Sequence, residues 1–303
     1  MKKTILLGSL VLAGLFASCS APTDNAAQTD YTQYVDVFIG AADNGHTFPG
    51  ATTPFGMIQT SPVTGAVGWR YCSEYMNADS IIWGFTQTHL SGTGCMDLGD
   101  VLVMPATGER TRAWDGYRSR FSKENESATP GYYSVILDEP GVKAELTASP
   151  RVALHRYTYN KAETPSVFID LQHGPTWNEQ QYHSQVSLCE VKWEDAQTLT
   201  GHVRNSVWVH QDYFFVLKFN RPTTEQINLP MAETEKGQRI VACFDLQPGD
   251  ELMTKIALST TSVEGARKNM DTEMPGWDFE ATREAAKADW NKYLSRIEVT
   301  GTD

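Results

Sequence analysis

The chain has 303 residues, and 25 basic against 37 acidic side chains give it a formal charge of −12. This acidic balance argues against nucleic acid as a partner, because phosphate backbones attract basic surfaces. Hydrophobic residues make up 41% and charged residues 20% of the sequence, values close to the globular average. They exclude a disordered chain, a collagen-like repeat and a multi-pass membrane protein.

The aromatic and turn-forming residues indicate an all-β protein rather than a helical bundle. The sequence contains 8 Trp, 12 Tyr and 12 Phe together with 23 Gly and 14 Pro. Strands favour aromatic side chains, while Gly and Pro supply the turns between short elements.

The N-terminal segment has the pattern of an export signal. Two lysines precede an apolar run from Ile5 to Ala17, and small residues lead to Cys19. The run is too short to span a membrane stably, since a spanning helix needs about 20 residues. Phe16 to Cys19 resembles a bacterial lipobox, so we predict a signal peptide over 1–18, lipidation of Cys19 and a polar linker over 19–33. The protein is then expected to be exported, as an outer-membrane or periplasmic lipoprotein; the alternative is an ordinary signal peptide with an incidental cysteine.

The remaining cysteines show no pattern typical of a metal site. Cys72, Cys95, Cys189 and Cys243 are isolated, without a CxxC or a Cys/His cluster at zinc spacing. An even number in an exported protein permits two disulfides, but each cysteine lies in or near an apolar or Gly-rich stretch. We therefore favour free thiols.

The Gly-rich region from residue 34 to 105 supplies the candidate binding groups. No phosphate-binding loop, dinucleotide fingerprint or nucleophile elbow fits it. Aromatic side chains in and after the region that could stack on sugars are Trp69, Tyr71, Tyr75, Trp83, Trp114 and Tyr117. Burial in the core is the competing role for such rings, and we interpret Trp83 as core because apolar residues flank it. Trp69 is the preferred sugar contact, since Gly68 and Arg70 flank it in a loop.

Polar residues of the same region could also act in catalysis. His46 and His89 are candidate ligands or acid/base groups, although a hydrogen bond that fixes a loop is the favoured role. Glycoside hydrolysis needs two carboxyl groups about 5 to 9.5 Å apart. Glu74 with Asp97 or Asp100 could supply them, but these carboxylates could equally accept N–H groups in turns.

From residue 131 onward, strand-like runs recur about every ten residues, separated by turn signals. The predicted strands are 133–137, 143–148, 152–159, 167–171, 186–193, 199–203, 207–219, 240–246 and 251–259. This spacing predicts a two-layer antiparallel β-sandwich over 34–274, uninterrupted by helix. The alternating run 143–148 should be half exposed, whereas Tyr213–Leu217 should be central.

A single helix is expected at the end of the chain. Asp278 is a plausible N-cap for a helix over Phe279–Arg296. Apolar residues at helical spacing, from Trp290 to Ile297, give it one face that needs a cover. We expect 275–303 to be a helical linker toward a further domain.

Several short stretches, in order, resemble one known family. They are Tyr34–Gly40, Gly45–Met57, Thr88–Gly94, Asp97–Asp100, Tyr117–Phe121, Pro130–Val135 and Trp290–Ile297. Over about residues 34 to 300 the sequence is similar to the N-terminal domain of glycoside hydrolase family 92, the bacterial α-mannosidases. The loop at Met76–Ala78 and Gln87 departs from the usual family pattern.

This resemblance implies a calcium-dependent, inverting, exo-acting enzyme that removes mannose from α-linked glycans. It implies a β-sandwich, a helical linker and an (α/α)₆ barrel that carries the catalytic residues and the calcium ligands. We expect the barrel to lie outside residues 1–303, so neither catalytic residues nor metal ligands are assigned to this chain. The sandwich should close one side of the pocket, with Trp69, Arg70, Tyr71 and His46 as substrate contacts.

Three hypotheses for function follow from these observations. The first is a non-catalytic, carbohydrate-binding sandwich of an α-mannosidase, whose partners are mannose-containing glycans, the barrel and a membrane reached through the lipid anchor. The second is a stand-alone glycan-binding surface lipoprotein. The third is a sandwich that hydrolyses glycosides by itself with Glu74 and Asp97 or Asp100.

Overall fold

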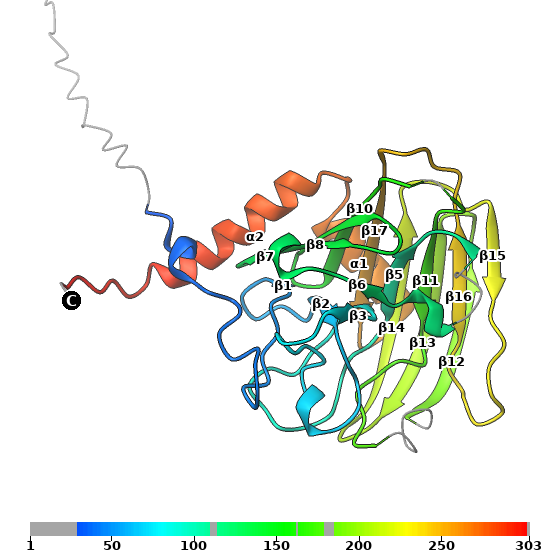
Figure 1. The fold of residues 1–303 in the computed structure, drawn as a ribbon, viewed down its shortest axis with the longest axis horizontal. Coiled ribbons are helices and arrows are strands. Elements are labelled where there is room, and N and C mark those ends of the chain that lie inside the picture. The colour runs from blue at the N-terminus through cyan, green and yellow to red at the C-terminus, as the bar shows by residue number, and fades with distance from the viewer. Residues whose placement is uncertain (1–28, 110–113, 162, 179–184, 302–303) are drawn as a thin grey trace, which may run out of the picture. The chain divides into compact units, whose positions relative to one another are not determined.

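Two antiparallel sheets form the frame of the protein (Figure 1). The structure is a computed structural model, and it describes residues 29–109, 114–161, 163–178 and 185–301. The first sheet has the order β1 (Ala51–Thr52), β2 (Gln59–Val63), β4 (Gly84–Thr86), β5 (Leu102–Ala106), β11 (Ser166–Asp170), β16 (Arg239–Cys243) and β15 (Glu225–Asn228). The second has the order β12 (Val186–Trp193), β13 (Thr198–Ser206), β14 (His210–Phe219), β17 (Asp250–Ser259), β10 (Val152–Tyr159), β9 (Val142–Ala148), β8 (Tyr132–Leu137) and β7 (Glu126–Thr129).

Short elements complete the frame. The strands β3 (Ile81–Ile82) and β6 (Ser119–Arg120) form a small separate ribbon. Single 3₁₀ turns occur at η1 (Tyr31–Tyr34), η2 (Trp69–Tyr71), η4 (Trp114–Tyr117) and η5 (Lys123–Asn125). The N–H of Tyr31 donates to Oδ1 of Asn291 at 2.7 Å, which ties η1 to the C-terminal helix.

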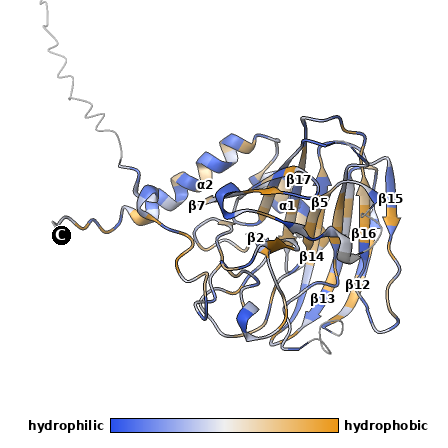
Figure 2. Ribbon diagram, viewed as in Figure 1, coloured by the Kyte–Doolittle hydropathy of each residue, from blue (hydrophilic) through white to orange (hydrophobic). Residues whose placement is uncertain are grey.

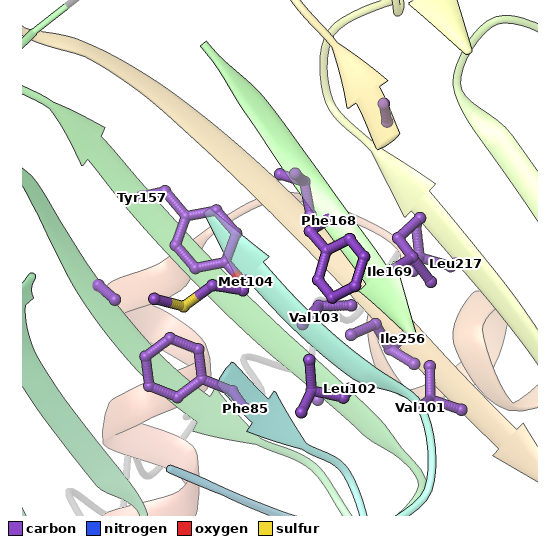
Figure 3. Packing of buried hydrophobic residues seen from close by; sticks show 14 of the residues in the cluster. Phe85, Val101, Leu102, Val103, Met104, Tyr157, Phe168, Ile169, Leu217 and Ile256 are labelled. Atoms are coloured by element: carbon purple, nitrogen blue, oxygen red, sulfur yellow. The ribbon is translucent and has the colours of Figure 1, made fainter. Parts of the chain in front are cut away.

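One apolar core lies between the two sheets. Phe85 and Met104 point inward from the first sheet, while Tyr157, Leu217 and Ile256 point inward from the second (Figure 3). All five are buried members of a single hydrophobic cluster. The predicted two-layer antiparallel sandwich is therefore confirmed.

The predicted strands after residue 131 are all present, with small shifts at their ends. Three strand ends shift by three residues. The strand expected to end at 203 ends at Ser206, and the one expected to end at 246 ends at Cys243. The strand expected from residue 207 begins at His210, because Ser206 pairs with His210 across a hairpin. Residues 207–209 form the tip of that hairpin, so the prediction was wrong there. The central position of Tyr213–Leu217 is confirmed, since β14 pairs with β13 and with β17.

A helix that the sequence analysis did not predict covers the outer face of the second sheet. This helix, α1 (Val263–Glu273), begins at Ser262, whose hydroxyl accepts the N–H of Gly265 at 3.0 Å. Ala266 and Met270 pack with outward-facing strand residues such as Val216 and Ala257. The expectation that helix appears only after 275 is therefore corrected. With two buried side chains in a polar segment, α1 gives a weak periodic signal.

The predicted C-terminal helix is present as α2 (Phe279–Leu294), two residues shorter than expected, so Ile297 lies beyond it and is exposed rather than part of a covered helix face. Oδ1 of Asp278 accepts the N–H of Ala281 at 2.9 Å, as expected of an N-cap. Near the other end, Nε1 of Trp290 donates to the carbonyl of Thr52 at 2.6 Å. Figure 2 shows α2 as largely hydrophilic, and within it only Phe279 and Ala286 are buried.

The packing of α2 overturns the predicted half exposure of residues 143–148. Glu145 and Thr147 are both buried, although they alternate with apolar residues as in an exposed strand. Arg156 donates to Glu145 at 2.9 Å and to Glu280 of α2 at 2.9 Å, so the helix closes over this polar face. A strand that a helix covers can bury charged residues when they are paired.

The structure gives no test of the predicted lipid anchor. The signal peptide and Cys19 lie outside the described residues. Across the described ranges, none of the helices combines the length and apolar character needed to cross a membrane. The four cysteines Cys72, Cys95, Cys189 and Cys243 are free thiols, as the sequence analysis favoured.

Candidate functional site

Two tryptophans from distant parts of the sequence stack on each other at the surface. The rings of Trp69 and Trp177 are 6.2 Å apart between centroids, with 21° between their planes. Trp69 is 49% and Trp177 is 48% exposed. Large aromatic rings normally bury most of their area, so a half-exposed stacked pair offers a broad face to a ligand.

A short backbone ladder holds the two tryptophans in place. The N–H of Gly68 donates to the carbonyl of Thr176 at 2.7 Å, and the N–H of Thr176 donates to the carbonyl of Ala66 at 2.8 Å. Val67 and Thr176 form an isolated parallel bridge. Trp69 directly follows Gly68 and Trp177 directly follows Thr176, so the pairing of these two backbone segments brings the two rings together.

Three further residues support the ring of Trp69. His46 meets it edge-on, with centroids 4.9 Å apart and 88° between the rings. Nε1 of Trp69 donates to Oδ1 of Asn44 at 3.2 Å. Gly94 lies so close that a Cβ there would be 2.0 Å from the ring. His46 is buried, and both of its ring nitrogens lack a partner within the described part of the chain. The favoured role of His46 as a hydrogen-bonding loop anchor is thus not what these contacts show.

The other two predicted sugar contacts turn toward Asp79. The hydroxyl of Tyr71 donates to Oδ2 of Asp79 at 3.0 Å, and burial followed by the charge of Asp79 raises the pKa of Tyr71. Nη2 of the exposed Arg70 lies 3.9 Å from Oδ1 of Asp79. The structure therefore brings Trp69 and His46 together, while Arg70 and Tyr71 form a separate group with Asp79.

A buried carboxylate, Glu74, lies five residues after Trp69 in the sequence and bonds to His173, four residues before Trp177. Nε2 of His173 donates to Oε1 of Glu74 at 2.6 Å, and the hydroxyl of Thr86 donates to Oε2 at 2.8 Å. Nε2 of His89 lies 3.3 Å from the same Oε2. Burial alone would raise the pKa of Glu74, but the charge and hydrogen bond of His173, the charge of His89 and the hydroxyl of Thr86 together hold it below the usual value. Glu74 is thus an ionised, fully enclosed group.

His89 fixes a loop, as predicted. Its Nδ1 donates to the carbonyl of Gln59 at 2.7 Å, and its N–H donates to Oε1 of the same residue at 3.0 Å. Burial lowers the pKa of His89, although the neighbouring Glu74 opposes this.

The two aspartates considered for catalysis are also occupied by protein donors. Asp97 is buried, and its Oδ2 accepts the N–H of Val209 at 2.7 Å. Oδ2 of Asp100 accepts the hydroxyl of Thr88 at 2.8 Å, and Oδ1 accepts the amide of Asn205 at 3.2 Å. Burial raises the pKa of Asp100 to about 6 against these hydrogen bonds. Both groups fasten the Gly-rich loop to the hairpin between β13 and β14.

These carboxylates do not fit the calcium ion that the resemblance implies. Calcium takes six to eight oxygen ligands, including ionised carboxylates with free lone pairs. Glu74, Asp97 and Asp100 are each buried and bonded to protein donors. Within the described ranges, no group of three or more His, Cys, Asp or Glu side chains could hold a metal ion.

A cavity of about 420 Å³ lies between η1, β1 and α2. Its lining includes the apolar residues Val35, Val37, Phe48, Phe55, Trp290 and Leu294. None of the four predicted sugar contacts lines it.

Other aromatic candidates are part of the interior. Tyr75 is buried, and Tyr117 is buried in a stack on Phe168 with centroids 3.8 Å apart. Trp83 packs against the core, as predicted. The side chain of Trp114 is outside the described part of the structure.

Neither Trp177 nor His173 was predicted as a site residue. The signal was available, because Trp177 follows Gly174 and Pro175 in a stretch without strand periodicity, as Trp69 follows Gly68. The contact between the two segments could not be predicted, since it depends on the order of strands in the first sheet.

Family models match almost the whole described chain. The model of the glycosyl hydrolase family 92 N-terminal domain matches residues 34–259, and the model of the family's catalytic domain matches residues 265–303. A curated relative from Arthroderma benhamiae, named an uncharacterized secreted glycosidase, is 25% identical over 89% of this chain and 39% of its own.

Solved structures agree with these matches. The family GH92 α-mannosidase BT3965 from Bacteroides thetaiotaomicron, in complex with mannoimidazole, is 32% identical, with a TM-score of 0.81 over 90% of this chain and 38% of its own. The GH92 inverting mannosidase BT2199 from the same species is 26% identical, with a TM-score of 0.75 over 90% of this chain and 37% of its own. The chain therefore spans about two fifths of the length of these relatives.

Proposed function

The chain belongs to glycoside hydrolase family 92, and from this membership we propose that it is the carbohydrate-binding sandwich of an exo-acting, inverting α-mannosidase. It forms one wall of a site for mannose-containing glycans. The match of residues 265–303 to the catalytic-domain model supports a two-domain enzyme over a stand-alone glycan-binding lipoprotein.

The stacked pair of Trp69 and Trp177 is the observation that carries this proposal. A pyranose has an apolar C–H face that packs on a flat indole, and the pair presents two half-exposed indoles in one place. His46 packs edge-on against Trp69 from within the protein, so it supports the ring, and its two enclosed ring nitrogens have no protein hydrogen bond in the described structure.

The chemistry is proposed to lie in the catalytic domain. Inverting hydrolysis needs a protonated carboxyl on the leaving oxygen and an ionised one that activates water. Glu74, Asp97 and Asp100 are enclosed and already accept protein hydrogen bonds, so neither substrate nor water reaches them. The calcium-dependent step belongs in the same domain, and the sandwich alone should release no mannose.

Export with a lipid anchor at Cys19 is part of the proposal. The sequence pattern before Cys19 supports it, as does the secreted relative. A Cys19→Ala variant should move from the membrane fraction to the soluble fraction. A variant that stays with the membrane would exclude lipidation of Cys19 as the anchor.

Titration with methyl α-mannoside tests the sugar site, with the heat of binding as the readout. One wall of a site should bind at millimolar affinity, because an aromatic platform contributes about 1 kcal/mol beyond burial. Trp69→Ala should abolish the signal. Trp208→Ala is the matched control, since Trp208 is exposed on the hairpin tip and has no stacking partner in the described structure. Equal loss in both variants, or in neither, would reject the stacked pair as the sugar site.

Mannose release from α-linked substrates, assayed with calcium, tests the division of labour. No release above a protein-free control is expected. Release that Glu74→Gln or Asp97→Asn abolishes would instead make the sandwich itself the enzyme.

A further inference from the structure

We infer that Glu74 is a positioning residue for the tryptophan pair: its buried carboxylate ties the segment that carries Trp69 to the segment that carries Trp177. The link runs through His173, which lies four residues before Trp177. The inference rests on the proposed function only for its sugar-binding consequence, and its main test is independent of any sugar.

The backbone of Glu74 closes the loop that contains Trp69. Its carbonyl accepts the N–H groups of Thr64 at 2.8 Å and Gly65 at 3.2 Å, and its N–H donates to the carbonyl of Tyr71 at 3.0 Å. These bonds close the loop from Thr64 to Glu74 and fasten the last residue of the 3₁₀ turn η2. A displacement of Glu74 is therefore expected to move the turn that carries Trp69.

The side chain of Glu74 binds the second tryptophan segment. Oε1 accepts Nε2 of His173 at 2.6 Å in a site where both side chains are buried. A charged hydrogen bond of this kind is short and strongly directional. Pro175, between His173 and Trp177, also presses on Gly99, where a Cβ would lie 2.6 Å from Pro175 and 2.7 Å from Oε1 of Glu74.

The backbone conformation shows that this side chain is kept for its contacts. Glu74 has a φ of +60°, in the left-handed region that favours glycine. Non-glycine residues persist there only when their surroundings over-determine the conformation, as commonly occurs at functional sites. Glycine would adopt this backbone conformation with less strain, and the hydrogen bonds of the Glu74 carboxylate compensate for the strain of a non-glycine residue.

Indole N–H resonances of the full chain provide the test. Trp69→Phe and Trp177→Phe assign the two signals among the eight tryptophans. In Glu74→Gln the signals of Trp69 and Trp177 should shift or split while the other indole signals stay in place. The amide of glutamine has one acceptor oxygen, so it cannot accept from both His173 and Thr86 as the carboxylate does. Glu145→Gln is the matched control: Glu145 is also a buried carboxylate with strong hydrogen bonds, but it lies under α2. It should leave both signals unchanged.

Two variants of His173 keep the test valid if Glu74→Gln fails to fold. His173→Gln retains an N–H donor near the position of Nε2 and should preserve the two signals, whereas His173→Phe retains a ring without the donor and should displace them. Unchanged signals in Glu74→Gln or in His173→Phe would overturn the inference, since the backbone ladder alone would then hold the pair. Displaced signals with mannoside binding intact would support the positioning role and reject the proposed sugar contact.

Discussion

The sheets from residue 119 to 259 and the Gly-rich loops from residue 36 to 100 are built in different ways. The first region consists of long antiparallel ladders around an apolar core. The second has short strands and buried polar clusters, such as Glu74 with His173 and Asp100 with Thr88. Within the described part of the chain, six of the seven non-glycine residues with left-handed backbone lie between residues 43 and 101. Strain and charge are thus concentrated where the tryptophan pair is, which indicates that the ladders stabilise the fold while the loops position the site.

The largest expected effect comes from the core. Phe215 is fully buried on β14, against Gly201 of the neighbouring strand. Phe215→Ala should lower the free energy of unfolding by about 3 to 5 kcal/mol, measured by urea denaturation. The indole signals of Trp69 and Trp177 should remain native while the protein is folded. A loss of those signals before the core unfolds would show that the two regions are not separable.

His155 joins the two regions. Acidification through its titration range should lower the free energy of unfolding nearly as much as Phe215→Ala does. It is buried on β10, with Nε2 2.8 Å from Oγ1 of Thr60 on β2 and Nδ1 2.6 Å from the hydroxyl of Tyr157. Burial lowers the pKa of His155 to about 3. The unfolded chain takes up a proton near pH 6.5 while the folded protein does not, so stability falls below pH 6.5 by up to about 1.4 kcal/mol for each pH unit until about pH 3.

His155→Gln measures this contribution by difference. The variant should lose some stability at pH 7 but show a smaller further loss between pH 6 and pH 4 than the unmodified chain. Parallel pH profiles for the two proteins would contradict a neutral, buried His155.

Asp100 should give the opposite pH dependence in the loop region. Its pKa is raised to about 6 by burial, so the folded protein holds a proton that the unfolded chain releases near pH 4. Protonated Asp100 therefore contributes roughly 3 kcal/mol to the free energy of unfolding below pH 4, and this contribution is lost as the pH rises to about 6. Asp100→Asn should remove this fall when unfolding is followed at pH 4, 5 and 6. An unchanged slope would mean that Asp100 ionises normally in the loop.

The same contrast explains what the sequence could predict. The strands after residue 131 alternate or form apolar runs between turn residues, so their pattern indicates them directly. Strand β2 does not, because Thr60 and Ser61 are buried polar residues, and Thr60 is satisfied by His155 on the opposite sheet. Buried polar partners that come from distant segments leave no periodic trace.

The candidate site was predictable only in part for the same reason. Trp69 stood out because glycine and arginine flank it in a loop, and the structure places it at the surface beside His46. Trp177 carries a similar local signal, but its contact with Trp69 depends on the ladder at Thr176. The function of Glu74 depends on His173, which no spacing in the sequence connects to it.

The smallest expected change in stability comes from two glycines of the loop that packs against Trp69. Comparing them distinguishes the effect of backbone strain from the effect of displacing the Trp69 ring. Gly94 has ordinary backbone geometry, and a Cβ there would meet the ring of Trp69 at 2.0 Å. Gly92 has a φ of +69°, and a Cβ there would meet nothing within 4 Å. Gly94→Ala should therefore displace the indole signal of Trp69 and abolish mannoside binding at a cost of roughly 0.5 to 1 kcal/mol, because the half-exposed ring can swing into solvent.

Gly92→Ala should do the reverse. It should lower the free energy of unfolding by about 1 to 2 kcal/mol through left-handed strain, while the Trp69 signal and the mannoside affinity stay unchanged. Both variants are measured by urea denaturation and by indole resonances at one pH. If the two alanines gave the same shift of the Trp69 signal, the loop would respond as a single strained unit. Ring position could then not be varied independently of backbone stability, and fold and site would not be separable at Trp69, the residue proposed to contact the sugar.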